Sequence, residues 1–341
     1  MATSLVFLLF APPRLSATPA NPGSPTEATL TGPVQGTLGA GTYRVLQPIL
    51  VPCGERLSLE PGCVLVFEPD TRLDVEGHIE ARGTEEQPVV LRSAADPPRP
   101  GQWGGVRIHP STNTSSTLVL DHCIIHHATT GLSVSNRSST VRVRNSVVAA
   151  CSLSGITLDA GTNFVEARLE LEKSRIHDVG GAGIFARTRA DGCEASGLAL
   201  SVDTCTFEYN GDAGVRVHCG ILGSNLCSTV TWPSPFGTAQ HVPSSIQLSI
   251  SNSVFTGNRH GIDVGSDRGA QSRTDSISLH SYGTPRAEVS ARIVNNLLVS
   301  NREDGIRLLL NTDDSGNLGV KCVNNTVVSH PATGISYSGA W

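Results

Sequence analysis

The sequence predicts an all-β fold, a single right-handed parallel β-helix in which short strands stack coil upon coil as a solenoid. Three observations predict it: a four-residue phrase recurs along the chain, alternating apolar positions precede its copies, and the composition suits a narrow stacked interior. Gly and Pro number 35 and 20 among 341 residues, aromatic residues make up 4%, and Met occurs once. A coiled coil or long helix would instead be rich in Ala, Glu, Lys and Leu.

Residues 1–20 are expected to form a secretory signal peptide. An apolar run at 5–11 is followed by small and polar residues at 16–20. This is the order of a secretory signal, although no Lys or Arg precedes the run. Residues 21–32 are predicted to be a flexible leader because Pro, Thr and Ala predominate there. We therefore expect a secreted or cell-surface protein, and no apolar stretch reaches the roughly 18 residues of a membrane helix.

Residues 33–341 are assigned to the β-helix, and 33–110 to its first coils. Strands are expected at 57–59, 64–67, 72–75, 78–81, 89–92 and 105–108. The turns between them contain Pro-Gly, Pro-Asp, Glu-Gly and Gly-Thr, which are common turn pairs or contain a turn residue. This stretch therefore continues the solenoid and is not a second domain.

The same stretch resembles a known family. The segments 59–67 (LEPGCVLVF), 73–84 (LDVEGHIEARGT), 87–89 (QPV) and 103–106 (WGGV) are similar to the opening coils of secreted right-handed β-helix proteins with the pectate-lyase-like fold. Similar segments occur in bacterial surface proteins and in the extracellular repeats of the insect junction protein called bark beetle. The resemblance covers most of residues 40–341. It implies the fold but no particular activity, since many members have no known chemistry.

Beyond residue 110 one phrase recurs: Gly, an aliphatic residue, any residue, then an apolar residue. Its copies begin at Gly131, Gly155, Gly183, Gly214, Gly261, Gly305 and Gly334. A short phrase, often with Asn, lies about ten residues earlier, and a longer alternating strand precedes that phrase. Each repeat therefore predicts three strands. We expect roughly nine or ten coils, which at about 4.8 Å per coil make a stack about 45 Å long.

The turns and apolar residues favour this architecture over a β-sandwich. Asn before the second strand suits a left-handed corner and can form an amide ladder between coils. A sandwich would show Asn-Gly hairpin turns roughly every 8–12 residues, but Asn210-Gly211 is the single Asn-Gly dipeptide. Four aromatic residues are expected to point inward: Phe67, Phe185, Phe207 and Phe255.

Insertions follow the Gly strand of several repeats, so they leave the solenoid at one corner. The longest follow Val217 and Val264, and shorter ones follow Ala186 and Leu308. Insertions on one face of a repeat protein often mark its binding face. We therefore expect a ligand on that side.

The inserts contain residues with the chemistry of a sugar site. Aromatic rings stack on apolar sugar faces, and polar or charged side chains bind hydroxyl groups. The candidate binding residues are Trp232, Phe236, His241, Asp267, Arg268, His280, Tyr282, Asp313 and Asp314. The alternative is that these loops only cap or brace the solenoid.

No catalytic residue is assigned. Glycoside hydrolysis requires two carboxylates, and cleavage of uronates commonly uses Ca²⁺ and a basic residue. The segment 311–314 (NTDD) is similar to part of the polygalacturonase signature, but the rest of that signature is missing downstream. The similarity is therefore interpreted as chance.

A stripe of acidic and His residues precedes the Gly strands: His177, Asp178, Asp212, His260, Glu303 and Asp304. We predict solvated turns there, with a Ca²⁺ site or an acid–base pair as the alternative. His122, His126 and His127 are predicted to be surface residues and not metal ligands, because no Cys or carboxylate partner stands at a fitting spacing.

The nine cysteines are scattered without a CxxC pair, so neither zinc nor another cofactor is expected. In an exported protein they predict disulfides with one thiol left over. Cys53 with Cys63, and Cys219 with Cys227, close short loops and are the expected pairs.

The net charge of -5 and the pI of about 6.1 predict no nucleic-acid partner. The sequence thus favours a non-catalytic secreted or cell-surface protein that binds a polysaccharide, a glycoprotein or another protein through the inserted loops. The alternatives are a polysaccharide lyase, hydrolase or epimerase with a diverged site, and a purely structural spacer.

Overall fold

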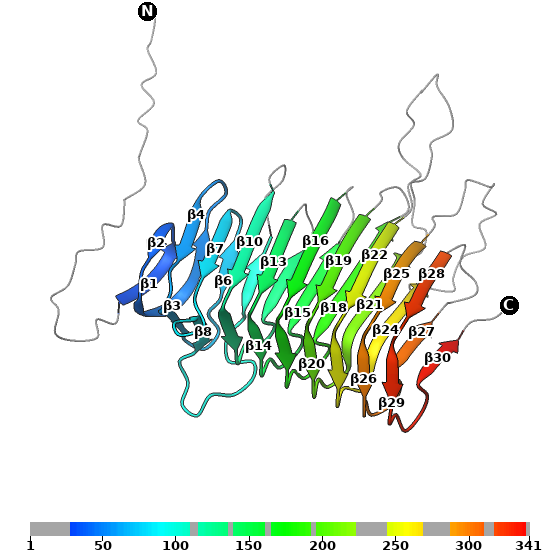
Figure 1. Cartoon of the computed structure of the whole chain (residues 1–341). Coiled ribbons are helices and arrows are strands. Elements are labelled where there is room, and N and C mark those ends of the chain that lie inside the picture. The colour runs from blue at the N-terminus through cyan, green and yellow to red at the C-terminus, as the bar shows by residue number, and fades with distance from the viewer. Residues whose placement is uncertain are drawn as a thin grey trace, which may run out of the picture.

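The computed structural model describes residues 28–109, 115–135, 139–160, 165–191, 196–222, 244–268, 287–309 and 317–338 (Figure 1). These residues form a right-handed parallel β-helix, as predicted. Neighbouring coils pair strand on strand in parallel register. The part of the chain that the structure describes contains no helix that could cross a membrane.

Three faces run along the stack, and each coil contributes one strand to each face in the order first, second, third. The first face is a ten-stranded sheet. Its strands are β2 (Gly36–Leu38), β4 (Arg56–Leu59), β7 (His78–Arg82), β10 (Ser116–Asp121), β13 (Ser139–Arg144), β16 (Val165–Glu172), β19 (Ser196–Asp203), β22 (Ser244–Ser251), β25 (Ala287–Val294) and β28 (Asn317–Val323).

The second face consists of β5 (Cys63–Phe67), β8 (Val89–Ser93), β11 (Cys123–His126), β14 (Val147–Ala149), β17 (Arg175–His177), β20 (Thr206–Glu208), β23 (Val254–Thr256), β26 (Leu297–Val299) and β29 (Thr326–Val328). The third consists of β6 (Leu73–Val75), β9 (Val106–Ile108), β12 (Leu132–Ser135), β15 (Ile156–Ala160), β18 (Ile184–Asp191), β21 (Ala213–Leu222), β24 (His260–Arg268), β27 (Ile306–Leu309) and β30 (Ile335–Ser338).

The N-terminal end is closed differently. The long strand β3 (Gly41–Val51) pairs with both β5 and β6, and β1 (Ala28–Pro33) pairs with β3. Counted from β2, the described residues make ten coils, in agreement with the prediction of nine or ten. β1 covers the last residues of the range expected for the leader, while residues 1–27 lie outside the described part.

The interior is a column of Val, Ile and Leu with a few stacked aromatic rings. Phe207 and Phe255 stack at 4.9 Å with an interplanar angle of 2°. This distance matches the spacing of about 4.8 Å between coils. Phe67 stacks on the buried Trp103 at 4.1 Å. The prediction was wrong for Phe185, which is only partly buried and lies on the outside of β18 beside the ring of His218.

The first two faces meet at a corner built on left-handed residues, here called the first corner. Its members share φ values of 47° to 56°: His122, Asn145, Lys173, Thr204, Asn252, Asn295 and Asn324. Asn tolerates this conformation better than most residues. The predicted corner is therefore confirmed. Nδ2 of Asn295 donates a hydrogen bond of 3.5 Å to Oδ1 of Asn252.

The second and third faces meet at a second left-handed corner. Its members are His127, Ala150, Asp178, Tyr209, Gly257, Ser300 and Ser329. Just inside it, three buried amides form a continuous ladder: Asn210 donates to Asn258 at 2.8 Å, and Asn258 donates to Asn301 at 3.1 Å. The predicted amide ladder exists at the first corner, where Asn296 donates to Asn325 at 3.0 Å, and the Asn210–Asn258–Asn301 ladder is a second one at this corner.

The expected disulfide between Cys53 and Cys63 is not formed, so that prediction is corrected. Both residues are free thiols: Cys63 is buried at the start of β5, whereas Cys53 is exposed in the turn after β3. The Cys63 side chain points into the interior, so Cys63 is part of the core. Cys227 lies outside the described residues, and Sγ of Cys219 lies 3.1 Å from Oγ1 of Thr188.

Other cysteines substitute for serine in a buried column behind the first corner. Sγ of Cys205 donates to the carbonyl of Asp203 at 3.1 Å, as the Ser174 hydroxyl donates to Glu172 at 2.8 Å. Cys123 occupies the same position three coils before Cys205. These cysteines therefore satisfy a local backbone requirement.

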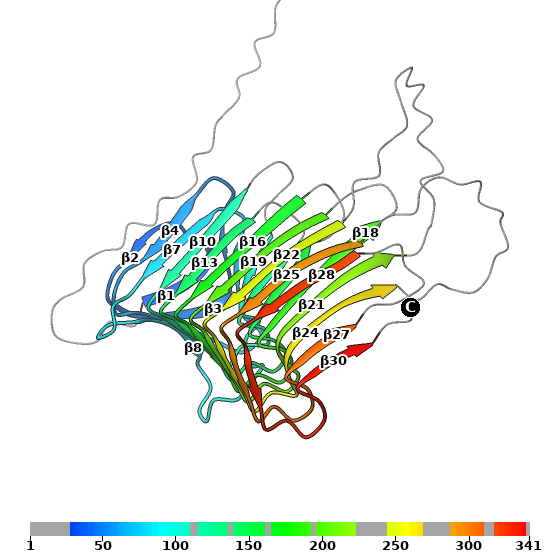
Figure 2. The same ribbon diagram turned by 45° about the vertical axis from the view of Figure 1, so that its right-hand side comes forward.

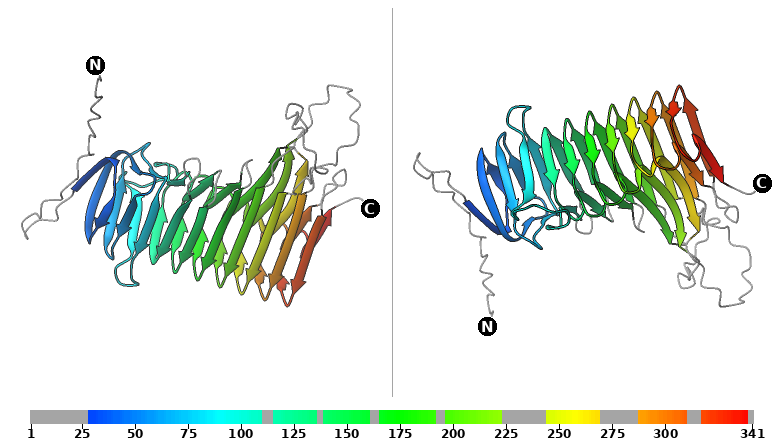
Figure 3. Two further views of the ribbon diagram at one scale, coloured as in Figure 1. Left: turned by 90° about the horizontal axis from the view of Figure 1, so that it is seen from above. Right: turned by 90° about the horizontal axis from the view of Figure 1, so that it is seen from below.

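The third face joins the first face of the next coil at the insert corner. Segments 223–243, 269–286 and 310–316 connect β21 to β22, β24 to β25, and β27 to β28. Figures 2 and 3 show these strands side by side at the C-terminal half of the stack. The two longest of these connections therefore begin on the third face of successive coils.

Candidate functional site

The third face carries one outward column of side chains in exact succession from coil to coil. Register aligns Ser133, Thr157, Phe185, Arg216, Asp263, Arg307 and Ser336. Each occupies the variable third position of the repeated Gly phrase. Arg216, Asp263 and Arg307 are three successive charged members of this column and alternate in sign, while the charged residues Asp74 and Arg107 occupy it in earlier coils. This arrangement places attractive partners about 4.8 Å apart on adjacent strands.

Asp263 lies at the centre of these charges. Its side chain is fully buried, Nε of Arg216 donates to it at 2.8 Å, and Arg307 donates through Nε at 3.0 Å and Nη2 at 2.6 Å. Burial alone would raise the pKa of Asp263, but the hydrogen bonds from Arg307, the nearby His218 and the charges of both arginines hold that pKa well below its usual range. Asp263 is therefore an ionised group that orients two guanidinium groups.

Neighbouring side chains fix Arg216 further. Asp212, at the second corner, accepts a bond of 2.7 Å from Nη2 of Arg216. Nε2 of His218 lies 3.7 Å from the Asp263 carboxylate, and its ring meets Phe185 edge-on at 6.4 Å. Arg216, His218 and Arg307 remain 18–22% exposed at their side chains, so each can contact a ligand.

His260 lies behind this column and is 1% exposed at its side chain. Nδ1 is 3.4 Å from Asp304 and Nε2 is 3.3 Å from Glu303, yet neither nitrogen forms a hydrogen bond with any residue that the structure describes. Burial, together with the charge of Arg307, lowers the pKa of His260. The prediction of solvated turns was therefore wrong for His260 and Asp304, which are buried.

We call this group the charged patch: Asp212, Arg216, His218, Arg259, His260, Asp263, Glu303, Asp304 and Arg307. Arg259 belongs to it through a bond of 2.8 Å to Glu303. All members come from the second corner or the third face of coils seven to nine. Within the described residues no group of three or more His, Cys, Asp or Glu is arranged to hold a metal ion.

An exposed aromatic ring stands at the edge of the charged patch. Tyr209, at the second corner, is 64% exposed. Its ring covers Gly257 of the next coil so closely that a Cβ on Gly257 would come within 2.5 Å of it. Arg302 reaches back two coils and donates to the carbonyls of Asn210 at 2.8 Å and Gly211 at 3.0 Å. A ring and a guanidinium group are thus held on one surface.

Most binding residues expected from the sequence lie outside the described residues: Trp232, Phe236, His241, His280, Tyr282, Asp313 and Asp314. Asp267 and Arg268 end strand β24, where their backbones pair with Gly220 and Ile221. The same strand carries Asp263 four residues earlier. The strands that lead into the inserts therefore also carry the charged patch.

Sequence reasoning missed Arg216, Asp263 and Arg307. The residue pattern placed candidate polar residues before the Gly phrase and in the inserts, and assigned no role to the variable position inside the phrase. Comparing that position across repeats would have shown Ser, Thr and Phe giving way to three successive charged residues. That change was the available signal.

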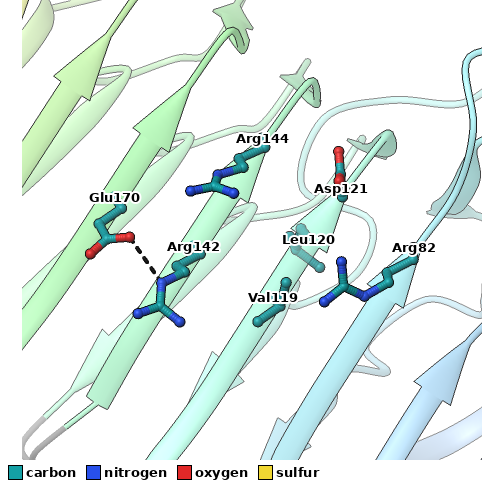
Figure 4. A pocket seen from close by; sticks show the side chains of 7 residues that line it. All are labelled: Arg82, Val119, Leu120, Asp121, Arg142, Arg144 and Glu170. Carbon is teal, nitrogen blue, oxygen red and sulfur yellow. Dashed lines mark hydrogen bonds and ion pairs between the residues drawn. The ribbon is translucent and has the colours of Figure 1, made fainter.

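A shallow hollow of about 360 Å³ lies elsewhere, on the first face. Figure 4 shows Arg82, Arg142 and Arg144 around the small side chain of Val119. Each arginine already has a carboxylate partner: Glu80 at 2.5 Å, Glu170 at 2.9 Å and Glu172 at 3.2 Å. These arginines are paired and 45–60% exposed at their side chains. The hollow is therefore lined by ion pairs between neighbouring strands and carries no concentrated positive charge.

Comparison with known proteins agrees with the fold. A family model described as "Right handed beta helix region" matches residues 104–197. This region is a right-handed β-helix. The matched part runs from just before β9 to the start of β19.

One solved structure is similar to the chain, an alginate lyase from Paenibacillus sp. str. FPU-7. It is 13% identical, the match covers 85% of this chain and 92% of that chain, and the TM-score is 0.33. Among the curated proteins, none matches the sequence.

Proposed function

We propose that the protein binds a polysaccharide along the third face of coils seven to nine, in the strip between the second corner and the inserts. The observation that carries the proposal is the charged patch, in which the buried Asp263 orients Arg216 and Arg307 on an accessible face. A polysaccharide is an extended ligand, and this strip is an extended site whose groups repeat from coil to coil.

The two arginines suit hydroxyl or carboxylate recognition. A guanidinium group has five N–H donors; Asp263 accepts one from Arg216 and two from Arg307, and Asp212 accepts another from Arg216. Their remaining donors can bond to sugar oxygens. Because both side chains are already held in place, binding costs less rotamer entropy than it would for unrestrained arginines.

Tyr209 supplies the apolar part of such a site. An exposed ring next to fixed polar groups can stack on the apolar face of a sugar. The inserts add further aromatic residues, such as Trp232 and Tyr282, to chain segments that begin on the third face. The signal-like residues 1–20 support a secreted or cell-surface location, where polysaccharides and glycoproteins are the available partners.

Cleavage of a uronate polymer is the second candidate, because one pair of residues favours it. His218 stands beside Arg216, with Nε2 3.7 Å from the carboxylate that also binds Arg216. An imidazole can abstract a proton, while a guanidinium group stabilises the charge that develops on the substrate. His218 would be the base in such a reaction.

A glycan array with the full-length protein tests the proposal. We expect binding to at least one polysaccharide, weakened about tenfold or more by Tyr209→Ala and by Arg307→Gln. The matched control, Arg142→Gln on the first face, should bind like the wild type. Circular dichroism confirms that each variant is folded.

The bound glycan is then incubated with the protein and assayed for unsaturated uronates and new reducing ends. Binding without product supports the non-catalytic function. Product that disappears in His218→Gln supports the second candidate. Failure to bind any glycan, or equal binding by all three variants, contradicts the proposed site.

A further inference from the structure

A pair of converging imidazole side chains lies far from the charged patch, at the second corner of coil four. Nδ1 of His126 and Nδ1 of His127 are 2.5 Å apart, and the two rings meet at 69° with their centroids 4.6 Å apart. Both residues are only partly buried. Two imidazole nitrogens therefore converge on one point at the surface.

The left-handed corner causes this convergence. In an extended strand, consecutive side chains point to opposite faces, so the sequence alone separates the two rings. His127 instead has φ of 62°, and the chain turns there at the end of β11. The turn brings the His127 ring to the same side as the His126 ring.

The backbone around the pair is held on three sides. Nε1 of the buried Trp103 donates to the carbonyl of His126 at 3.0 Å. The carbonyl of His127 accepts from the amide of Gln102 at 3.2 Å, and its amide donates to Ala149 at 3.3 Å. These bonds involve only main-chain atoms of the two histidines, so the backbone is held in place while both rings can still turn.

We propose that His126 and His127 bind one divalent transition-metal ion through their Nδ1 atoms. Imidazole nitrogen suits copper, nickel and zinc, and copper(II) has the highest affinity in that series. Two ligands at about 2.0–2.1 Å from the ion require the nitrogens to move apart to roughly 3 Å. Small rotations of two partly exposed rings provide this.

The next coil leaves room for the remaining ligands. Register places Ala149 opposite His126, and Ala150 follows at the corner. Their methyl groups are the smallest side chains available, so water molecules can complete the coordination beside the rings. The preceding coil presents Arg92, whose positive charge faces His126, so we expect moderate rather than tight affinity.

The same corner offers a matched control two coils further on. His177 and Asp178 occupy the positions of His126 and His127, and Nδ1 of His177 lies 2.6 Å from Asp178. This pair is roughly 10 Å from the histidine pair, too far to share its ion. It supplies one nitrogen where the proposed site supplies two.

Copper(II) titration followed by electron paramagnetic resonance tests the proposal. The background protein carries Cys53→Ser and Cys322→Ser, because these are the exposed thiols of the described residues. We expect one copper per chain with hyperfine splitting from two nitrogens. His126→Gln and His127→Gln should each weaken binding about tenfold or more, while His177→Gln leaves it unchanged.

Two outcomes overturn the proposal. One is splitting from a single nitrogen in the background protein, a result that needs no histidine variant to fold. The other is unchanged affinity in His126→Gln or His127→Gln, which would mean that the two rings merely share a proton. Neither result depends on glycan binding at the third face.

Discussion

Arg307 binds the buried carboxylate of Asp263 through two of its nitrogens, at 3.0 and 2.6 Å, although 44 residues separate the two in sequence. Arg216 binds the same carboxylate from the other side at 2.8 Å. A fully buried acid thus joins three successive coils. Its removal should affect both the stability of the stack and the shape of the surface above it.

Replacing Asp263 should destabilise the protein strongly. Asp263→Asn removes the charge that compensates two partly buried arginines, and breaking a buried ion pair costs about 3 kcal/mol or more. Urea denaturation measures the change. The control is Asp159→Asn, because the Asp159 pair with Arg187 is partly exposed and should contribute under about 1 kcal/mol. Equal losses in the two variants would contradict the central role of Asp263.

The contribution of Asp263 should vanish in acid. Its pKa is lower in the folded protein than in the unfolded chain, where the value is about 3.9. The stabilisation is therefore complete above about pH 4 and is lost as the pH falls through the folded pKa. Thermal midpoints of wild type and Asp263→Asn should differ by a constant amount from about pH 7 to 5 and converge below about pH 4. A difference that widens in acid would contradict this linkage.

The buried amide ladder should be sensitive to loss of one rung. Asn258 accepts from the backbone amide and side chain of Asn210, and it donates to Phe207 and Asn301. Asn258→Ala leaves several buried groups unpaired, so we expect a loss of about 2–4 kcal/mol by urea denaturation. Asn252→Gly is the control: it preserves the left-handed corner and should cost under about 1 kcal/mol. A small loss for Asn258→Ala would show that the ladder adds little.

Gly214 of the repeated phrase should tolerate a side chain far less well than Gly319. A Cβ on Gly214 would meet the ring of Phe255 at 2.5 Å and the carbonyl of Gly261 at 2.8 Å, whereas on Gly319 its nearest contact is 3.9 Å. Gly214→Ala should destabilise by about 1–3 kcal/mol, and Gly319→Ala should be neutral or slightly stabilising. Thermal unfolding of both variants distinguishes close packing from a general preference for Gly.

Cysteine accessibility should follow burial. Burial raises the pKa of the Cys63, Cys123, Cys151 and Cys205 thiols to about 12. We expect iodoacetamide to modify Cys53 in the native protein and these four only after unfolding, because the thiolate is the reactive form. Mass spectrometry with and without prior reduction gives the readout. If Cys53 and Cys63 both resist modification until reduced, they form a disulfide after all.

The repeat made much of the fold predictable from sequence. The strands expected before residue 110 agree with β4 to β9 within about two residues at each end. Alternation is a local pattern that neighbouring coils repeat, so each copy reinforces the others. The pattern was least informative outside the core: Phe185 occupies a variable position, and its outward direction follows from its place in the phrase and not from its hydrophobicity.

The candidate sites were harder to predict. Sequence reasoning chose residues by type within the inserts, and only Asp267 and Arg268 of that set lie in described strands. It also assigned Cys53 and Cys63 to a disulfide from the short loop between them. Loop length does not show which way each side chain points, and Cys63 points into the core.

The sequence by itself determined the parallel solenoid, its left-handed corners and the side on which the inserts emerge, because these depend on a periodicity that every coil repeats. Only the tertiary structure decided which side chains meet. Arg216 and Asp263 are 47 residues apart but adjacent in register, since inserts of different length separate the coils. His126 and His127 are neighbours in sequence, but a positive φ turns their rings toward each other. Such contacts depend on register and on corner geometry, which composition and spacing do not specify.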